Sequence, residues 1–196
     1  MLASAKIMVK NNIRKSLLEQ GQLLSKKFIS KNNRLIQSIA INEIDIKSSK
    51  NNLLYFPFRR EVCVDEIKLE LKRFSKNIYM PRIISKKKMK FNLLTDKDCI
   101  EKNIYGIKEI TNENFLDPVH FNTMFIPFVG VDSSGARLGY GGGYFDRALS
   151  NLDSCESKPI IVGLGYDYQV LSSSFGEPHD IKYDIVITES RILSFS

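Results

Sequence analysis

The densest group of residues that could do chemistry lies in the segment 137–147, and glycine dominates it. Four of the chain's 11 glycines fall within five positions of this segment: Gly139, Gly141, Gly142 and Gly143. Glycine lets the backbone adopt positive φ angles and approach a ligand closely, and a glycine-rich loop that leads into a helix presents N–H groups to an anion. A bare tight turn would account for one or two glycines, not for four. The segment therefore predicts a phosphate-binding loop.

The loop does not follow the common phosphate-binding patterns. It contains no G-K-[ST] sequence, and the G-x-G-x-x-G spacing fails because Tyr144 stands where the last glycine would be. Arg137 and Arg147 supply fixed positive charge, which phosphoryl transfer uses as negative charge moves between oxygens. Asp146 falls in the first turn of the expected helix, where a carboxylate can cap the helix or bind a Mg²⁺ ion that bridges nucleotide phosphates.

The sequence from Arg137 to Asp146, RLGYGGGYFD, resembles the signature of the 5-formyltetrahydrofolate cyclo-ligase family, also called methenyltetrahydrofolate synthetases. The preceding residues 125–132 resemble the strand and turn that lead into that signature. The similarity extends over nearly the whole chain: to Lys10 and Arg14, to residues 56–62 and 105–109, to Gly163-Leu164 with Gln169, and to residues 177–180. Four positions depart from the family pattern, namely Arg60 for glycine, Cys63 for an acidic residue, Ile110 for a frequent proline and Phe145 for a common tyrosine.

The resemblance implies a ligase that uses ATP and Mg²⁺ to convert 5-formyltetrahydrofolate into 5,10-methenyltetrahydrofolate, with release of ADP and phosphate. A formyl group on nitrogen is a poor electrophile, and its oxygen would have to leave as hydroxide. Phosphorylation of that oxygen creates a phosphate leaving group, and the neighbouring amine then closes the ring. Because no covalent nucleophile is needed, the lack of a G-x-S-x-G elbow in the sequence is expected.

The family pattern implies three groups of site residues. The ATP-binding group is Lys10, Arg14, Arg137, Leu138, Gly139, Tyr140, Gly141, Gly142, Gly143, Tyr144 and Phe145. The substrate-binding group is Phe56, Glu61, Tyr105, Tyr140, Gly141, Gly142, Gly143 and Tyr144. Arg137 and Tyr144 are the expected catalytic residues, and Asp146 and Asp180 are the expected Mg²⁺ ligands.

Simpler structural roles stay open for several of these residues: solvated helix positions for Lys10 and Arg14, a core aromatic residue for Tyr105, a turn for Asp180, and an ion pair with Arg59 or Arg60 for Glu61. We expect His179 to give structural support or a hydrogen bond, because one histidine beside two carboxylates is weak evidence for a transition metal.

The hydrophobic pattern predicts an α/β fold, with three α/β/α layers around a central, largely parallel or mixed sheet. Helical spacing of apolar residues predicts two N-terminal helices, over 2–20 and 23–41, that separate near Gly21. Later helices are expected over 65–74 and 144–149, and strands over 53–56, 77–80 (ended by Pro81), 89–94, part of 121–131, 159–164 and, last, 183–188. Ligands of such sheets bind beyond the carboxyl ends of the strands, so we expect the site in the loops that follow them.

Composition limits the other possibilities. A chain of 196 residues can bury about 70% of its surface in one core, and no linker divides it, so we expect a single domain over 1–196. Three cysteines at wide spacing argue against a disulfide scaffold or a zinc site. The sequence has no apolar run near the roughly 18 residues of a membrane span and no secretion signal at its start, which predicts a soluble cytoplasmic protein.

The net charge of +7 favours anionic ligands. Two other functions stay open at this point: a nucleotide- or phosphate-binding enzyme of another reaction class, and an RNA-binding module. The second is disfavoured because the aromatic and basic residues form no RNA-recognition pattern, and we expect no nucleic-acid partner. Arg59, Arg60 and the run Lys86-Lys87-Lys88 could border the pocket and bind the glutamate tail of a polyglutamylated folate. The oligomeric state does not follow from the sequence.

Overall fold

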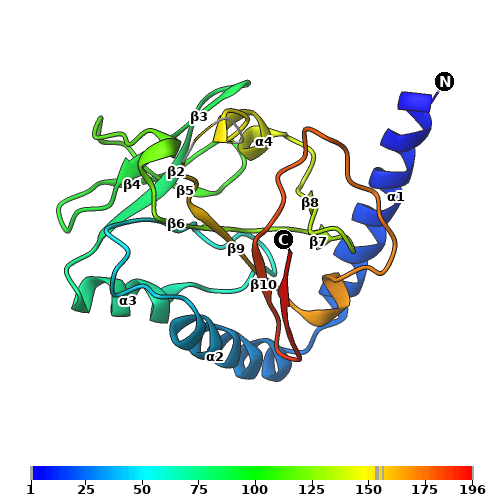
Figure 1. Cartoon of the computed structure of the whole chain (residues 1–196), viewed down its shortest axis with the longest axis horizontal. Coiled ribbons are helices and arrows are strands. Elements are labelled where there is room, and N and C mark those ends of the chain that lie inside the picture. Colours follow the sequence, from blue (N-terminus) through cyan, green and yellow to red (C-terminus); the bar gives the residue numbers. More distant parts are fainter. Residues whose placement is uncertain (1, 153–154, 156, 196) are drawn as a thin grey trace.

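The computed structural model describes residues 2–152, 155 and 157–195 (Figure 1). The elements, in chain order, are α1 (Leu2–Leu23), α2 (Lys26–Glu43), β1 (Asn51–Leu53), α3 (Asp65–Arg73), β2 (Asn77–Ser85), β3 (Lys88–Leu93), β4 (Ile100–Lys102), β5 (Lys108–Ile110), η1 (Pro118–His120), β6 (Thr123–Ile126), β7 (Gly130–Val131), β8 (Arg137–Leu138), α4 (Tyr144–Ala148), β9 (Ile160–Leu164), η3 (Asp167–Gln169), β10 (Ile185–Ile187) and β11 (Ile192–Ser194). No helix within this described part is both long enough and apolar enough to cross a membrane.

A mixed sheet with the strand order β11-β10-β9-β6-β1-β2-β3 forms the centre of the fold. The inner neighbours β10, β9, β6, β1 and β2 run parallel, whereas β3 and β11 add antiparallel edges. β1, α3 and β2 form a β-α-β unit. The expectation of a central, largely parallel or mixed sheet is therefore confirmed.

Helices cover both faces of this sheet, as Figure 1 shows, with α2 and α3 below it and α4 above. Consecutive strand residues point to opposite faces: Leu54 packs with Ile36 of α2 and Ile67 of α3, whereas Leu53 packs in the cluster that contains Phe145 of α4. Both faces are thus apolar and buried, which explains why the strands read as continuous apolar runs. The three-layer prediction is confirmed.

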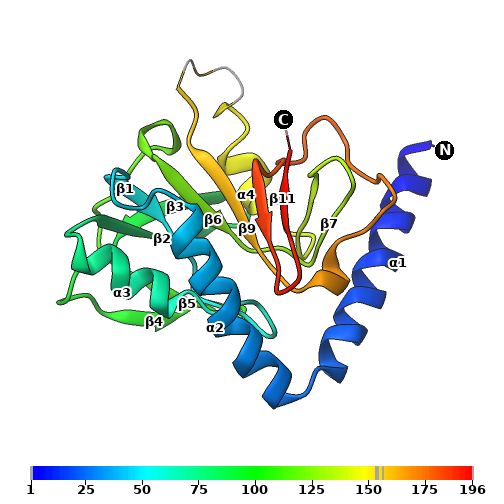
Figure 2. The same cartoon turned by 60° about the horizontal axis from the view of Figure 1, so that its bottom comes forward.

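The first helix lies apart from these layers. Figure 2 shows α1 at one end of the molecule, meeting α2 at an angle. Leu17 of α1 packs against Val129 and Leu138, beside the small hairpin of β7 and β8. The boundary between the two helices falls at Leu24-Ser25, where the Ser25 side chain caps α2 by accepting a hydrogen bond from Phe28 N, and not at Gly21, which lies within α1. The contacts of Leu17 with Val129 and Leu138 hold α1 against the carboxyl-terminal end of the parallel strands.

Three details differ from the sequence prediction. β2 continues through Pro81, which pairs with Phe91 of β3. The nitrogen of Pro81 faces the other neighbour, β1, whose pairing with β2 already ends at Tyr79. No ladder hydrogen bond is therefore lost at the proline. Residues 96–118, which show little periodicity, contain the β4–β5 hairpin. The strand near 183–188 is not the last, since β11 follows it; its three residues are too few for a period-two signal.

Candidate active site

A cavity of about 430 Å³ opens at the carboxyl ends of the parallel strands. Its walls come from α1, the loop after β1, the loop after β6, the glycine-rich loop and η3: Leu17, Leu18, Gly21, Gln22, Arg59, Arg60, Glu61, Phe128, Val129, Tyr140, Tyr168 and Gln169. The wall thus combines apolar and aromatic side chains with charged and amide groups that can orient a small molecule. Its position agrees with the edge of the sheet where the sequence predicts chemistry.

Tyr140 and Arg59 of the cavity wall pack together with Phe58, which lies next to the wall and does not line the cavity itself. The rings of Phe58 and Tyr140 meet edge to face, with centroids 5.5 Å apart. The guanidinium of Arg59 lies over both rings, 5.1 Å from the Phe58 centroid and 5.6 Å from that of Tyr140. Because Tyr140 belongs to the glycine-rich loop, this wall joins that loop to the segment after β1.

Glu61 is the acidic side chain of the cavity wall. Its Oε2 accepts a hydrogen bond of 2.8 Å from Phe58 N. Burial nevertheless raises the pKa of Glu61 to about 8, although the Phe58 hydrogen bond and the charge of Arg137 both oppose the rise. A carboxyl group with this pKa keeps its proton near neutral pH and can donate a hydrogen bond to a ligand. The alternative of a simple ion pair with Arg59 or Arg60 has no support among the ion pairs of the described residues.

The glycine-rich loop uses its glycines at two positions of positive φ. Gly141 has φ 98° and Gly143, which precedes α4, has φ 61°. Gly142 has no positive φ, but a Cβ there would lie 2.8 Å from the ring of Tyr144. α4 has only five residues, so its dipole is small and the exposed loop amides remain the groups suited to an anion.

Arg137 lies buried beneath this loop with a side-chain exposure of 7%. Its Nε donates to Pro127 O at 2.8 Å, its guanidinium lies 5.1 Å from the Phe145 centroid, and its Nη1 lies 3.7 Å from Asp146 Oδ1. The side chains of Leu138 and Phe145 are core residues, packed in the clusters of Leu17 and of β6. Only the backbone of these two residues is therefore placed to contact a ligand.

α1 brings a second arginine to the loop. Arg14 Nε donates to Gly139 O at 2.7 Å, and a Cβ on Gly141 would lie 3.6 Å from the Arg14 guanidinium. Burial and the charge of Arg137 together lower the pKa of Arg14. Two arginines that repel each other beside exposed amides make a site that an anion would stabilise. The solvated-helix interpretation of Arg14 is therefore wrong.

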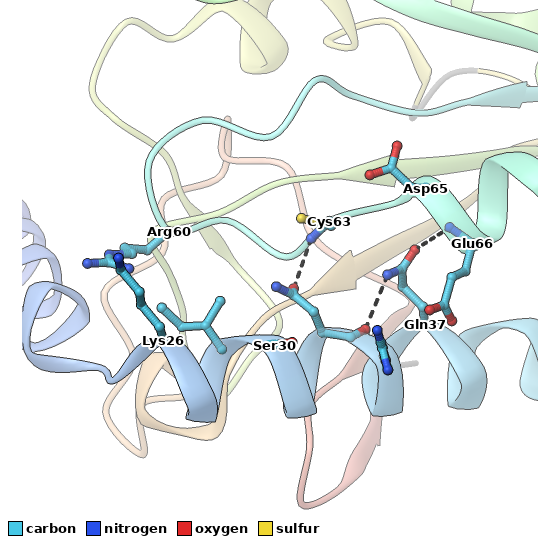
Figure 3. Close-up of a pocket in the computed structure, with 10 residues that line it drawn as sticks. Lys26, Ser30, Gln37, Arg60, Cys63, Asp65 and Glu66 are labelled. Carbon is cyan, nitrogen blue, oxygen red and sulfur yellow. Dashed lines mark hydrogen bonds between the residues drawn. The ribbon is translucent and has the colours of Figure 1, made fainter.

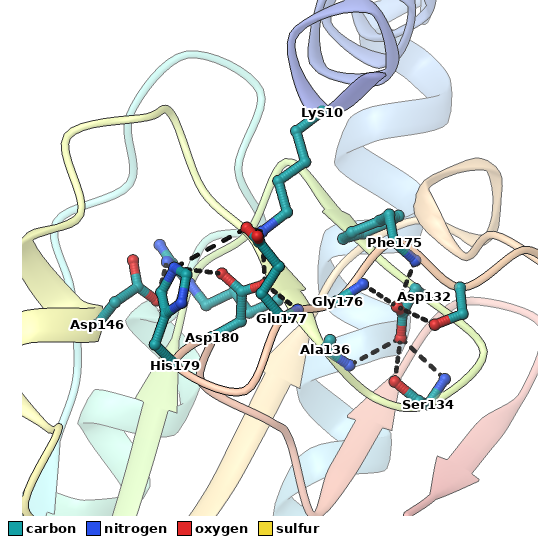
Figure 4. A network of polar contacts seen from close by, with 12 residues as sticks. Lys10, Asp132, Ser134, Ala136, Asp146, Phe175, Gly176, Glu177, His179 and Asp180 are labelled. Carbon is teal, nitrogen blue, oxygen red and sulfur yellow. Dashed lines mark hydrogen bonds and ion pairs between the residues drawn. The ribbon is translucent and has the colours of Figure 1, made fainter. Parts of the chain in front are cut away.

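Lys10, one turn earlier on α1, contacts the segment before β10 (Figure 4). Its Nζ lies 2.8 Å from Glu177 Oε2 and 2.6 Å from Asp180 Oδ2. Burial opposes the charge of Lys10, but the bonds to Asp180 and Glu177 raise its pKa. His179 is exposed, and its Nε2 lies 3.9 Å from each of these carboxylates. Lys10 and Asp180 are thus tied to each other, not solvated separately.

The two aspartates expected to bind Mg²⁺ suit that ion. Asp146 Oδ1 is buried and accepts no hydrogen bond from any described residue. Asp180 engages Lys10 through Oδ2, while its Oδ1 lies 3.9 Å from His179 Nε2, beyond hydrogen-bond distance. Each residue therefore offers one carboxylate oxygen, the ligand type that Mg²⁺ prefers when it also contacts phosphates. Figure 4 draws Asp146 on the same side of the network as His179 and Asp180.

The β4–β5 hairpin brings Tyr105 to the other side of the glycine-rich loop. Tyr105 and Tyr144 have hydroxyl oxygens 3.1 Å apart and ring centroids 6.4 Å apart. Tyr105 is 50% exposed, so it is not the core aromatic residue that the sequence left open. The pair forms an exposed aromatic surface next to the loop.

Two expected positions lie elsewhere. Phe56 packs against the core cluster under α2 and does not line the cavity. The run Lys86-Lys87-Lys88 lies at the β2–β3 turn and does not line the cavity; Lys87 O accepts a hydrogen bond from Arg147 Nε at 3.2 Å. Arg59 and Arg60 do line it, as the sequence suggests.

The model of one protein family, described as the 5-formyltetrahydrofolate cyclo-ligase family, matches residues 6–189 of this chain. The chain belongs to that family. Among curated cyclo-ligases it is 31% identical to the Haemophilus influenzae protein, over 76% of this chain and 81% of the other. It is 27% identical to the Mycoplasma genitalium protein, over 91% and 96% of the two chains.

Solved structures of related proteins have the same fold. The 5,10-methenyltetrahydrofolate synthetase of Aquifex aeolicus superposes with a TM-score of 0.81 at 25% identity, covering 95% of this chain and 92% of that one. The corresponding enzyme of Mycoplasma pneumoniae gives 0.75 at 26% identity, covering 92% and 98%. The enzyme class that the resemblance implies is thus confirmed for this cyclo-ligase family member.

Cyclo-ligase residues that the sequence did not single out also line the cavity. Tyr168 and Phe128 contribute rings, and burial raises the pKa of Tyr168 to about 12. Gln169 Nε2 donates to Phe128 O at 3.2 Å and to Val129 O at 3.0 Å, which holds η3 against the loop after β6. Gln169 matched a closing segment of the family, but no local pattern marks the two rings.

A second hollow of about 390 Å³ lies between α2 and the segment before α3, and Figure 3 shows ten residues that line it. Its buried amides already have partners, because Asn33 accepts from Cys63 N at 3.0 Å and Gln37 accepts from Glu66 N at 2.8 Å. These bonds fix the segment that carries Glu61. Arg60 lines both cavities, so this hollow supports the wall of the candidate active site.

Proposed function

We propose that this protein catalyses the ATP- and Mg²⁺-dependent cyclisation of 5-formyltetrahydrofolate to 5,10-methenyltetrahydrofolate, with release of ADP and phosphate. The γ-phosphoryl group of ATP passes to the formyl oxygen. The neighbouring amine of the folate then attacks the formyl carbon, the C–O bond breaks, and the oxygen leaves with the phosphate. Family membership supports the ring closure.

One observation carries the proposal for this chain: a single loop borders both a cationic, amide-rich surface and the folate-sized cavity. Arg14 contacts the loop at Gly139, and Tyr140, the next residue, lines the cavity with Glu61. A ligand on the loop amides and a ligand in the cavity would therefore meet at residues 139–144. Direct transfer between two bound reactants needs that proximity.

On the nucleotide side, the residues provide positive charge and backbone donors. Arg14 and Arg137 would balance the phosphate charge, and exposed N–H groups of Gly141 and Gly142 would bind phosphate oxygens. Asp146 and Asp180 would hold Mg²⁺, which, when bound, neutralises charge on the phosphate oxygens. Lys10 would turn from Asp180 toward the nucleotide.

On the folate side, Glu61 and the rings of the cavity orient the substrate. Glu61, protonated near neutral pH, can donate a hydrogen bond to an acceptor on the folate. The ring of Tyr140, which packs edge to face against Phe58, offers flat apolar surface to the folate ring system, and Tyr105 with Tyr144 covers the loop from the other side. We assign Arg137 and Tyr144 as catalytic residues, one for charge and one for alignment.

An absorbance assay for the methenyl product tests the proposal. The protein is incubated with ATP, Mg²⁺ and 5-formyltetrahydrofolate, and each is omitted in turn. Product that requires all three, with one ADP formed per methenyl group, is the expected result. ADP formation that does not depend on the folate would instead indicate another nucleotide-using reaction.

A further inference from the structure

The buried carboxylate of Asp132 is unusual in the number of hydrogen bonds that it accepts. Its side chain is 0% exposed, and it receives six hydrogen bonds from four backbone N–H groups and two serine hydroxyls (Figure 4). None of the ion pairs in the described part of the chain involves it. These donors lower the pKa of Asp132 to about 2 although burial opposes the charge.

The two oxygens of this carboxylate serve two different segments. Oδ1 accepts from Ser134 N at 2.8 Å, Ser134 Oγ at 2.7 Å and Ala136 N at 2.9 Å, which shapes the turn that leads into Arg137. Oδ2 accepts from Ser174 Oγ at 3.3 Å and from the N–H groups of Phe175 and Gly176, each at 2.8 Å. Asp132 therefore joins the turn that follows it to a segment around Phe175, 43 positions later in the sequence.

Gly176 allows the two segments to approach closely. A Cβ on Gly176 would lie 2.4 Å from the Cβ of Ala136, a separation that real side chains do not reach. The sequence thus has glycine where the segment 174–176, held by Asp132 Oδ2, crosses the turn before Arg137.

Glu177 and Asp180, the two carboxylates that bind Lys10, follow directly after the segment 174–176. Glu177 is the next residue, and residues 177–180 form a turn in which Asp180 N donates to Glu177 O at 3.0 Å. Beyond the turn, the chain is fixed again, because Arg137 N donates to Ile181 O at 2.8 Å and Tyr183 N to Gly135 O at 3.0 Å. Glu177 and Asp180 therefore lie in a turn that is fixed on one side by the hydrogen bonds to Asp132 and on the other side by the bonds to Arg137 and Gly135.

We propose that Asp132 is a positioning residue for ATP binding, holding the Glu177–Asp180 turn at a fixed distance from Arg137 and the glycine-rich loop. The inference rests on the proposed function, since it assigns the nucleotide to that loop. Asp132 does not touch the ligand. It acts through Asp180 and Lys10, whose positions depend on the segment that Oδ2 holds.

The negative charge of Asp132 is essential to this role. Asparagine has the same shape, but its amide nitrogen would face N–H donors in place of one carboxylate oxygen. Either the turn at 134–136 or the segment at 174–176 would lose its acceptor. The folate cavity has none of these residues in its wall, so its ligand should be unaffected.

The test compares Asp132→Asn with wild type in three measurements: ATP binding by calorimetry, 5-formyltetrahydrofolate binding by fluorescence, and hydrogen–deuterium exchange. We expect ATP binding to weaken at least about tenfold, equivalent to about 1.4 kcal/mol, while folate binding changes less than about twofold. Exchange should rise at residues 174–180 and stay unchanged in β6 and β9. As a control, Asn52→Ala removes a buried amide on the inner strand β1, whose side chain bonds to Ser49 and to none of the residues around Asp132, and should leave ATP binding unchanged.

Gly176→Ala gives an independent test in case Asp132→Asn does not fold, because it displaces the same segment and leaves Asp132 intact. Unchanged ATP affinity in a folded variant of either kind would overturn the inference, as would an equal loss of ATP and folate binding. Wild-type protein that binds no ATP would overturn the proposed function and this inference with it. If wild type binds ATP and the folded variants bind it equally well, the proposed function stands and only the role of Asp132 is overturned.

Discussion

Glu61 and Asp146 are two carboxyl groups of the candidate site with opposite expected charge states. Burial keeps Glu61 protonated near neutral pH, whereas Asp146 Oδ1 is buried with Arg137 as its nearest cation, 3.7 Å away. One group is thus suited to donate a hydrogen bond and the other to bind a cation. Substitution by the matching amide tests each role.

For Asp146, the amide keeps the shape and removes the charge. We expect Asp146→Asn to lower product formation by at least roughly 10–100-fold, the loss typical when support of a metal site is removed. The rate should also require more Mg²⁺ to reach saturation. Unchanged product formation at saturating Mg²⁺ would show that Asp146 does not bind the metal.

For Glu61, the pKa makes stability depend on pH. The unfolded chain releases this proton near pH 4.5 and the folded chain near pH 8, so between these values the folded state binds more protons. Stability must therefore fall as pH rises through this window. Glu61→Gln, which resembles the protonated acid, should raise Tm at pH 8 by about 2–4 °C for each kcal/mol gained.

The matched controls for Glu61 are pH and position. Below pH 4 the variant and wild type should melt together, because Glu61 is then protonated in both the folded and the unfolded protein. Glu101→Gln, on the exposed strand β4, should change Tm at neither pH. A variant that melts below wild type at pH 8 would contradict the pKa assignment.

At the scale of elements, close packing explains the glycine at position 142 of the glycine-rich loop, whereas positive φ explains the glycines at 141 and 143. Gly142 has no positive φ, so the reason to expect harm from a side chain there is the ring of Tyr144, 2.8 Å from the added Cβ. The displaced ring would also lose its contact with Tyr105.

We therefore expect Gly142→Val to fold and to bind ATP at least about tenfold more weakly, a loss of about 1.4 kcal/mol, measured by calorimetry. Gly106→Ala is the control. It strains a positive φ of 78° at the tip of the β4–β5 hairpin, where a Cβ meets nothing within 4 Å among the described residues, and should bind ATP normally. Normal ATP binding by folded Gly142→Val would remove the nucleotide from this loop.

At the scale of the whole molecule, the net charge of +7 should favour binding of the negatively charged glutamate tail of a polyglutamylated folate. Arg60 borders the cavity, whereas the run Lys86-Lys87-Lys88 lies at the β2–β3 turn outside its wall. A polyglutamylated folate should therefore gain its electrostatic contacts from Arg60 and its neighbour Arg59, with about 0.2–1 kcal/mol for each exposed pair.

The measurement is the Michaelis constant for monoglutamate and polyglutamate substrates at low and high salt. We expect the polyglutamate to have the lower constant at low salt and the difference to shrink as salt rises. Arg60→Ser should reduce the difference, and Lys86/Lys87/Lys88→Ser should not. Equal constants at every salt concentration in wild type would show that these charges are only solvated.

The sequence by itself determined what depends on neighbouring residues. Apolar periodicity predicted α2, α3 and the inner strands, and the composition of residues 137–146 predicted the glycine-rich loop and the family. It failed where an element is short or polar, at β11 and the β4–β5 hairpin, because three residues carry almost no periodic signal.

Only the tertiary structure decided which distant residues meet. Lys10 and Asp180 are 170 positions apart in the sequence, yet Lys10 Nζ lies 2.6 Å from Asp180 Oδ2. The course of the loop after β1 decides that Arg59, Arg60 and Glu61 line the cavity and that Phe56 does not. Burial then sets the chemistry. The pKa of Glu61 and the charge of Asp132 follow from desolvation and from donors that the fold supplies, and neither can be read from the residues beside them.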